Sequence, residues 1–408
     1  MAGYDRIKKI DFALLATVLL LIVFGLVALY SATYVTEAPG SHLKFTKQLL
    51  WVLIGLLVLL ISVMVPLKIF YKYAYLIYGI SVLLLLVVLI VGTGPGSRRW
   101  IPLGPFSLQP AEFSKVATLL ALAKYLSRDN RNLHTLKDVL VPFMLIVIPL
   151  LLIMKQPDLG SSLVFLALSL PVLHWAGLPG GVLFILLAPV LSFFCAFSYY
   201  SFFVAMILIV GALFLMRRGI VFFLVNFVLN VGVGVLTPIL WHLLKGYQKN
   251  RILTFLGMVT DPHGLGYQVI QSKVAIGSGG FLGKGFLQGT QTHLRFLPEQ
   301  HTDFIFCVVG EEFGFLGAFL ILLLFLYLIY KSLTLATIVK SRFASILVFG
   351  ITIVFLFQIF VNIGMTIGIM PVTGLPLPFL SYGGSALIAN LMLVGFILNA
   401  SGTRFEYT

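Results

Sequence analysis

A short polar segment near residue 300 carries the residues best suited to acid–base chemistry. Glu299, His301 and Asp303 fall together immediately before a long apolar run. An aspartate held beside such neighbours can take a proton from a hydroxyl nucleophile. An aspartate at the start of a helix is also an ideal N-cap, and the spacing favours that structural role for Asp303. The two roles are compatible, so the segment is a candidate catalytic site.

Two further pairs of ionisable residues lie inside apolar runs. Glu112 and Lys115 are three positions apart, on one face of a predicted helix. Glu311 and Glu312 follow Asp303 in the same run, about 12–13 Å farther along a helix, which places them within the hydrocarbon. Charged groups at such depth are costly, so they are either paired or functional. An internal ion pair is favoured for Glu112 and Lys115. For the two glutamates, a structural role, as an ion pair or a protonated carboxyl, and catalysis stay equally open.

Two predicted turns add cations that suit an anionic ligand. Arg98, Arg99 and Trp100 follow a glycine-rich segment. Guanidinium pairs bind phosphate well, and tryptophan suits either a sugar ring or the membrane interface. An aromatic belt with headgroup-binding arginines is an equally good interpretation. Lys155 and Asp158 lie in another turn between apolar runs, for which a simple surface turn is the favoured interpretation.

The elements that position these residues are predicted to be membrane helices. The chain of 408 residues is 60% hydrophobic and 10% charged, whereas soluble domains average about 45–50% and 25%. Runs long enough to span a bilayer recur along it, at residues 11–33, 47–65, 73–91, 111–126, 139–154, 159–175, 181–197, 200–216, 220–243, 303–330, 344–369 and 382–400. The sequence therefore predicts an all-α polytopic membrane protein with about 10–12 transmembrane helices.

Basic residues in the short loops predict the orientation. Most of them face the cytoplasm if both termini are cytoplasmic. This explains the net charge of +14 without a nucleic-acid partner. The same topology makes residues 244–302 a large structured extracytoplasmic loop, with an interfacial helix near residues 266–276. Long loops carry chemistry more often than short ones, and the basic character of this loop suits an anionic partner.

Several familiar chemistries lack support in the sequence. It contains no P-loop, no HExxH, no nucleophile elbow and no CxxC. The sequence therefore gives no support to nucleotide hydrolysis or zinc proteolysis. Cys195 and Cys307 both lie in apolar runs and are interpreted as packing residues.

Five motifs, taken in chain order, resemble the SEDS family of cell-wall proteins, which includes FtsW, RodA and SpoVE. They lie at residues 109–115, 156–160, 271–280, 297–306 and 376–385. The resemblance extends over most of the chain, so residues 1–408 are treated as one membrane domain. The sequence of residues 289–303 is more similar to that of RodA, the elongation member, than to that of FtsW, its division counterpart. Since the family usually has ten spans, residues 181–216 are predicted to form an extra transmembrane hairpin.

The resemblance implies a peptidoglycan glycosyltransferase that polymerises lipid II into glycan strands at the outer face of the cytoplasmic membrane, during cell elongation and shape maintenance. It places the essential aspartate of the family at Asp303, the buried acid–base pair at Glu112 and Lys115, and a further motif position at Trp100. Asp303 would deprotonate the 4-hydroxyl of an acceptor sugar. That oxygen would attack the anomeric carbon of a lipid-linked donor and expel polyprenyl diphosphate in one inverting step.

The developing negative charge of that leaving group requires cations. The candidates are Arg98, Arg99, Lys155 and Lys273. A divalent cation, Mg²⁺ or Mn²⁺, could assist, although the sequence shows no ligand set for one. The resemblance also implies a class B penicillin-binding transpeptidase and the cell-elongation machinery as partners, besides lipid II and the nascent glycan. Two alternatives stay open: a lipid II flippase that uses the intramembrane charges, and a noncatalytic scaffold that activates a penicillin-binding protein.

Overall fold

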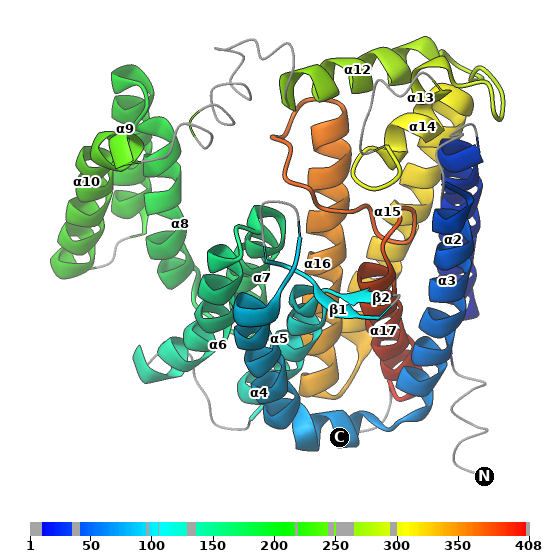
Figure 1. Cartoon of the computed structure of the whole chain (residues 1–408). Coiled ribbons are helices and arrows are strands. Elements are labelled where there is room, and N and C mark those ends of the chain that lie inside the picture. Colours follow the sequence, from blue (N-terminus) through cyan, green and yellow to red (C-terminus); the bar gives the residue numbers. More distant parts are fainter. Residues whose placement is uncertain are drawn as a thin grey trace. The chain divides into compact units, whose positions relative to one another are not determined.

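The computed structural model describes residues 10–34, 41–94, 98–104, 106–128, 136–216, 219–243, 249, 265–293 and 300–404. These residues are almost entirely helical (Figure 1). The helices are α2 (Phe12–Tyr34), α3 (Ser41–Met64), α4 (Leu67–Val91), α5 (Pro110–Leu126), α6 (Leu136–Lys155), α7 (Leu159–Trp175), α8 (Gly180–Cys195), α9 (Tyr199–Leu215), α10 (Ile220–Leu243), α12 (Leu265–Ser278), α13 (Thr290–His293), α14 (Ile305–Glu312), α15 (Gly314–Ile338), α16 (Arg342–Thr366) and α17 (Gly384–Gly402).

The prediction of an all-α polytopic membrane protein is confirmed. Seven of the described helices are long and apolar enough to cross a bilayer, namely α2, α3, α4, α10, α15, α16 and α17. Large apolar side chains such as Leu53, Leu83 and Ile90 are exposed along them. Exposed apolar surface on this scale is unsuited to water and suits lipid.

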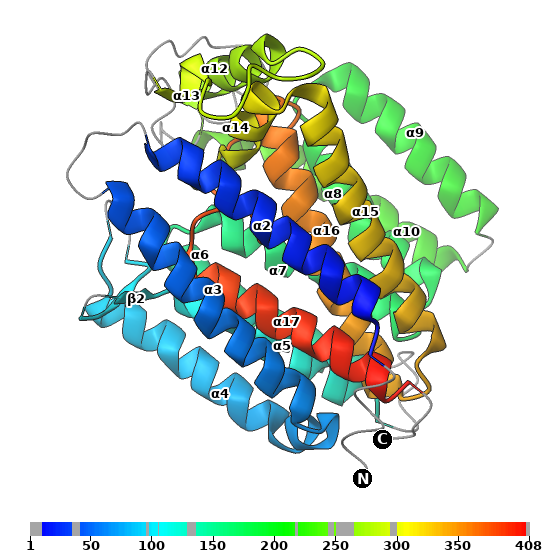
Figure 2. The ribbon, with the colours of Figure 1, turned by 90° about the vertical axis from the view of Figure 1, so that its right-hand side faces the viewer.

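The described helices fall into two compact units. One contains α2–α7 and α12–α17, and the other contains α8–α10. In the larger unit α17 is mostly buried, and α3 runs beside it (Figure 2). A Cβ on Gly395 of α17 would lie 2.5 Å from the Cβ of Ser62 on α3. The missing side chain at Gly395 therefore lets the two helices approach closely.

The predicted span at 303–330 is wrong in one respect, because the structure divides it into two helices. α14 ends at Glu312 and α15 begins at Gly314, which adopts φ +63°. This left-handed conformation costs glycine little, so the chain turns there. Glu311 and Glu312 consequently lie at the end of α14, before the spanning helix α15, and not within one continuous helix.

Residues 92–109 contain a small sheet that the sequence did not predict. Strand β1 (Ile101–Leu103) pairs antiparallel with β2 (Phe106–Leu108), and Pro102 lies opposite Ser107. The main chains of Thr93 and Trp100 bond to each other in both directions, at 2.8 and 3.1 Å. A β-hairpin thus follows the glycine-rich segment and leads into α5.

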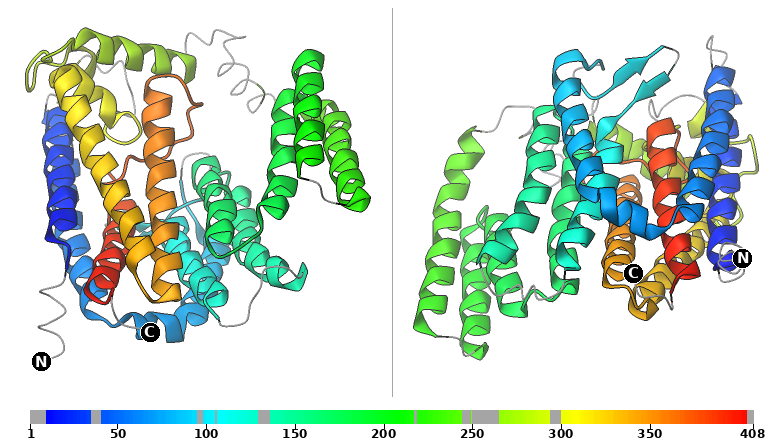
Figure 3. Two further views of the ribbon diagram at one scale, coloured as in Figure 1. Left: turned by 180° about the vertical axis from the view of Figure 1, so that it is seen from behind. Right: turned by 90° about the horizontal axis from the view of Figure 1, so that it is seen from below.

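The predicted large loop contains α12 and α13, and α12 lies across α14 and the end of α16 (Figure 3). Ala275 of α12 is buried against Phe304 and Cys307. Hence α12 packs on protein as well as presenting an exposed apolar face. The region predicted as an extra hairpin contains α8 and α9, which are separated by residues 196–198. Glu299 lies outside the described residues.

Candidate active site

Asp303 lies half-buried in the turn that precedes α14. The N-cap of α14 is Phe304, and no side chain caps it. The prediction that Asp303 caps the helix is therefore wrong. A Cβ on Gly374 would lie 3.5 Å from Asp303 Oδ2, and Gly374 has φ +75°. Asp303 Oδ2 therefore lies close to the main chain of Gly374, a position that has no side chain.

Asn362 of α16 fixes the main chain around Asp303. Its side-chain amide donates to the carbonyl of Asp303 at 2.9 Å and to that of Leu375 at 2.7 Å. Asn362 is fully buried. Asn362 therefore joins the Asp303 turn to the segment that contains Leu375.

His301 is positioned by two neighbours. Lys44 Nζ lies 3.1 Å from His301 Nε2, and the Tyr382 ring centre lies 5.9 Å from the imidazole centre. Burial raises the pKa of Tyr382, so its phenol stays neutral near pH 7. The main-chain N–H of Tyr382 donates to the His301 carbonyl at 2.9 Å. This turn is therefore tied to α3 and to the segment before α17.

The 92–109 and 155–161 turns meet at a second cluster of polar contacts. Arg99 Nε donates to the Gln156 carbonyl at 3.4 Å, and Arg99 Nη2 donates to the Pro157 carbonyl. Asp158 accepts from Gln109 Nε2 at 3.1 Å and from the Ser161 N–H at 3.1 Å, which makes it the N-cap of α7. Arg99 and Asp158 therefore hold the turns together.

The remaining predicted cations lie at the surface. Arg98 is exposed and donates to the Leu89 carbonyl at 3.2 Å, whereas Trp100 is half-buried. Lys155 and Lys273 are exposed. The Lys273 side chain passes over Gly368, where a Cβ would lie 2.3 Å from its Cε. Their exposed charges are accessible to an anionic ligand.

The 371–385 segment joins the two clusters. A Cβ on Gly160, just after Asp158, would lie 2.9 Å from the Thr373 carbonyl. On the other side of the segment, the Ser381 hydroxyl donates to the Thr302 carbonyl at 2.6 Å, and Ser385 Oγ accepts from the Gln109 N–H at 3.0 Å. Three motifs distant in sequence, at 109–115, 156–160 and 297–306, therefore converge on residues 371–385, which include the motif at 376–385. Sequence reasoning missed these serines because small polar residues also serve as helix contacts.

Glu112 and Lys115 form an ion pair of 2.8 Å on α5, as predicted from their spacing. Both side chains are at most 2% exposed. Among the described residues the Lys115 ammonium has no further hydrogen-bond partner. Glu112 and Lys115 thus form an internal ion pair within the helix bundle.

Glu311 anchors the segment that leads toward the Asp303 turn. Its Oε1, fully buried, accepts from Lys284 Nζ at 2.7 Å, from Thr290 Oγ1 at 3.1 Å and from the Gln291 N–H at 2.9 Å. The main chain reinforces this contact, because the Lys284 N–H donates to the Glu311 carbonyl at 3.0 Å. The sequence left open whether Glu311 is paired or catalytic, and in the structure it is paired with Lys284.

Replacing Lys284 by methionine is expected to lower the free energy of unfolding by about 1–2 kcal/mol. Removal of the ammonium deprives a buried carboxylate of one donor, and water screens part of the effect because Lys284 is 25% exposed. Lys331→Met is the matched control, since both partners of its pair with Asp11 are partly exposed, and its loss should cost less than about 1 kcal/mol. Denaturant unfolding in detergent measures both. Equal losses in the two variants would contradict the anchoring role.

Glu312 predicts a pH dependence of stability. It precedes α15, bonds to the Ser31 hydroxyl, and burial raises its pKa to about 7. A carboxyl with a raised pKa stabilises the fold fully below the ordinary value of 4.5 and loses that contribution as the pH rises through 7. The unfolding temperature of the wild type should therefore fall between about pH 5 and 8 relative to that of Glu312→Gln. Parallel pH curves for the two proteins would contradict it.

A divalent cation is not supported by the described side chains. Within the described ranges no three His, Cys, Asp or Glu side chains gather closely enough to hold a metal ion. The chemistry below is written with the side chains of the protein alone.

The fold and the converging loops define a polytopic membrane protein with one polar site built from loops between spans. The chain matches the family model FTSW_RODA_SPOVE, described as "Cell cycle protein", over residues 12–209 and 199–405. The chain belongs to this family, as its motifs predicted.

Similarity to individual relatives supports the same family membership. The peptidoglycan glycosyltransferase MrdB of Escherichia coli K12 is 35% identical over 384 residues, covering 93% of this chain and 92% of that protein. The peptidoglycan glycosyltransferase RodA of Treponema pallidum is 32% identical and covers 98% and 99% of the two chains. The crystal structure of RodA from Thermus thermophilus superimposes with a TM-score of 0.64 at 28% identity, covering 97% of this chain and 98% of that one. A chain from a structure titled as a peptidoglycan synthase complex that coordinates polymerization and crosslinking gives 0.73 at 32% identity, covering 97% and 99%.

Proposed function

We propose that this protein is a peptidoglycan glycosyltransferase that polymerises lipid II during cell elongation. The observation that carries the proposal is the position of Asp303. Its Oδ2 lies beside Gly374, within residues 371–385, which contact three other sequence motifs. The family membership and relatives named as peptidoglycan glycosyltransferases support the same activity.

In the reaction, Asp303 accepts the proton of the acceptor's 4-hydroxyl as that oxygen attacks the anomeric carbon of the donor. The bond from that carbon to the diphosphate oxygen breaks, and its electron pair leaves with polyprenyl diphosphate. One displacement converts the α-linked donor into a β-linked product, so the enzyme needs no nucleophile of its own. The Asn362 contact to the Asp303 carbonyl keeps the base in place during this step.

Positive charge must accompany the leaving diphosphate. Arg98, Lys155 and Lys273 are exposed in the site's loops and in α12, and we assign this role to them. Arg99 and Asp158 instead keep the turns in register, since their polar groups bind main chain and neighbouring side chains. Trp100 is assigned to sugar contact, and Glu299 and His301 to support of Asp303.

The site is assigned to the outer face of the cytoplasmic membrane, with both termini inside, because the short loops of the opposite face carry most of the basic residues. We infer a class B penicillin-binding transpeptidase as partner, since one similar chain comes from a complex that couples polymerization with crosslinking. Residues 181–216 are assigned as an added hairpin that contributes no residue to this site.

Lipid II supplied in detergent micelles tests the proposal, because micelles have no two sides and transport cannot contribute. The purified protein with its transpeptidase partner should produce a glycan ladder on a gel, and a muramidase specific for β-1,4 linkages should digest it. The absence of product, together with lipid II movement across reconstituted vesicles, would instead establish the flippase. The paired state of Glu112 and Glu311 argues against charges that line a transport path.

A further inference from the structure

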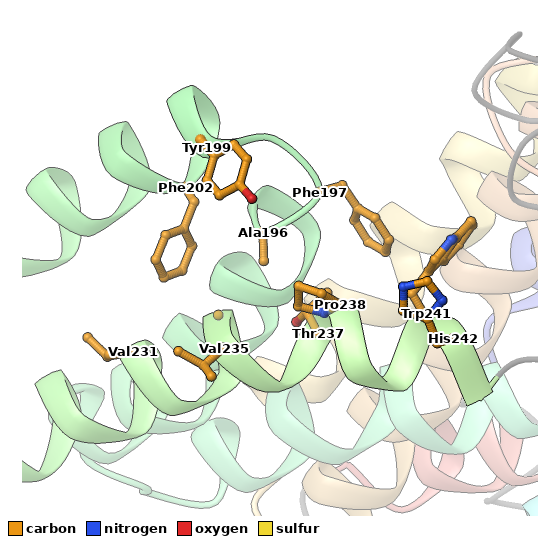
Figure 4. A pocket seen from close by; sticks show the side chains of 11 residues that line it. Ala196, Phe197, Tyr199, Phe202, Val231, Val235, Thr237, Pro238, Trp241 and His242 are labelled. Atoms are coloured by element: carbon orange, nitrogen blue, oxygen red, sulfur yellow. The ribbon is translucent and has the colours of Figure 1, made fainter.

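A pocket of about 550 Å³ lies within the α8–α10 unit, where α8 ends, α9 begins and α10 ends (Figure 4). The glycosyl transfer described above uses none of its residues. Its wall is mainly apolar and aromatic, and includes Phe197, Tyr199, Phe202, Val235, Pro238 and Trp241. A volume of this size falls within the usual range of about 300–1,000 Å³ for small-molecule sites.

Local packing forms the pocket without a ligand. The Phe202 ring lies over Gly234, where a Cβ would be 2.2 Å from the ring, so only glycine permits this placement. Pro238 lacks an N–H and cannot bond to the carbonyl of Gly234, which loosens α10 at the pocket. The buried Ser192 hydroxyl donates to Asn230 at 2.6 Å and fixes α8 against α10.

One end of the pocket is polar, and the main chain there accepts a hydrogen bond from a lysine outside the lining. Trp241 and His242 line it side by side. Among the residues that the structure describes, neither the indole N–H nor the imidazole makes a hydrogen bond. Lys249 Nζ donates to the His242 carbonyl at 3.3 Å, which leaves two ammonium protons for another acceptor. The pocket is thus apolar along most of its wall and has the ammonium group of Lys249 near one end, where α10 ends.

We propose that this pocket binds the acyl chain of an anionic phospholipid, with the lipid phosphate against Lys249 and His242. Aromatic and aliphatic walls offer no partners to water, whereas acyl chains are the abundant apolar molecules of the bilayer. Tryptophan and basic side chains at helix ends are suited to lipid headgroups. The predicted orientation makes the ligand a lipid of the outer leaflet. Bilayer composition would then act directly on the α8–α10 unit.

Native mass spectrometry of the purified protein tests the proposal with phosphatidylglycerol and phosphatidylcholine as probes. The wild type should retain one phosphatidylglycerol that Val235→Phe loses, because phenylalanine fills the pocket. Val228→Phe is the matched control, since Val228 lies on the same helix outside the pocket and both valines are 64% exposed. Lys249→Ala should reduce the preference for phosphatidylglycerol over phosphatidylcholine about fivefold.

Equal retention of phosphatidylglycerol by Val235→Phe and Val228→Phe, with both variants folded by circular dichroism, would overturn the proposal. A polyprenyl phosphate that displaces phosphatidylglycerol from the wild type at equal concentration would also overturn it. In that case the pocket belongs to a carrier lipid. An unchanged headgroup preference in Lys249→Ala would remove the role of the cation.

Discussion

Replacing Asp303 by asparagine is expected to reduce the rate of lipid II polymerisation by about 10²–10⁴-fold, the usual contribution of a positioned general base. Asparagine keeps the size of the side chain but cannot accept the proton. The main-chain carbonyl of residue 303 still accepts from Asn362, and α14 loses no cap. The free energy of unfolding should therefore change by no more than about 1.5 kcal/mol, the range of a single hydrogen bond. Initial rates of glycan formation and denaturant unfolding measure the two effects separately.

Asp11→Asn is the matched control for this variant. Asp11 pairs with Lys331 at 3.2 Å, is partly exposed and lies at the start of α2, away from the converging loops. It should polymerise lipid II at the wild-type rate. If Asp303→Asn also retained most of its activity, the base would lie elsewhere. If both variants were inactive, loss of negative charge would act generally and not through the site.

Replacing Lys115 by methionine is expected to lower the free energy of unfolding by about 3–5 kcal/mol, because it leaves the buried carboxylate of Glu112 without a counter-charge. Lys124→Met on the same helix is the control. Lys124 donates to the Lys72 carbonyl at an exposed position, so its loss should cost less than about 1 kcal/mol. Unfolding in mixed micelles measures both.

The double variant Glu112→Gln with Lys115→Met separates structure from catalysis. Because it removes both charges together, most of the lost stability should return. A double variant that is stable and active identifies the pair as structural. A stable but inactive one would place the pair in the reaction and would contradict a purely internal ion pair.

Hydropathy was sufficient to predict the membrane helices, because the length of apolar chain needed to cross a bilayer does not depend on which helices become neighbours. The break at Gly314 was not predictable in the same way. A glycine inside an apolar run can also serve as a packing position, as Gly395 does in α17. The β1–β2 hairpin was not predicted because its strands contain only three residues each.

Residue types located the motifs of the site, but not the contacts that join them. Asp303 was predicted to be a cap because it precedes a helix, whereas the helix begins two residues later. Contacts between Asn362 and Leu375 or between Ser385 and Gln109 join segments from different parts of the chain. Such pairings depend on the packed bundle and leave no local pattern in sequence.

The central claim is that glycan synthesis takes place on this chain, at Asp303. The most direct measurement disables the chain and its transpeptidase partner in turn, within the same purified complex, and resolves lipid II products on a gel. We predict glycan ladders when the transpeptidase carries an inactivated active site, and none when this chain carries Asp303→Ala. Ladders that persist with Asp303→Ala and vanish with the inactivated partner would contradict the claim and would make this chain a scaffold.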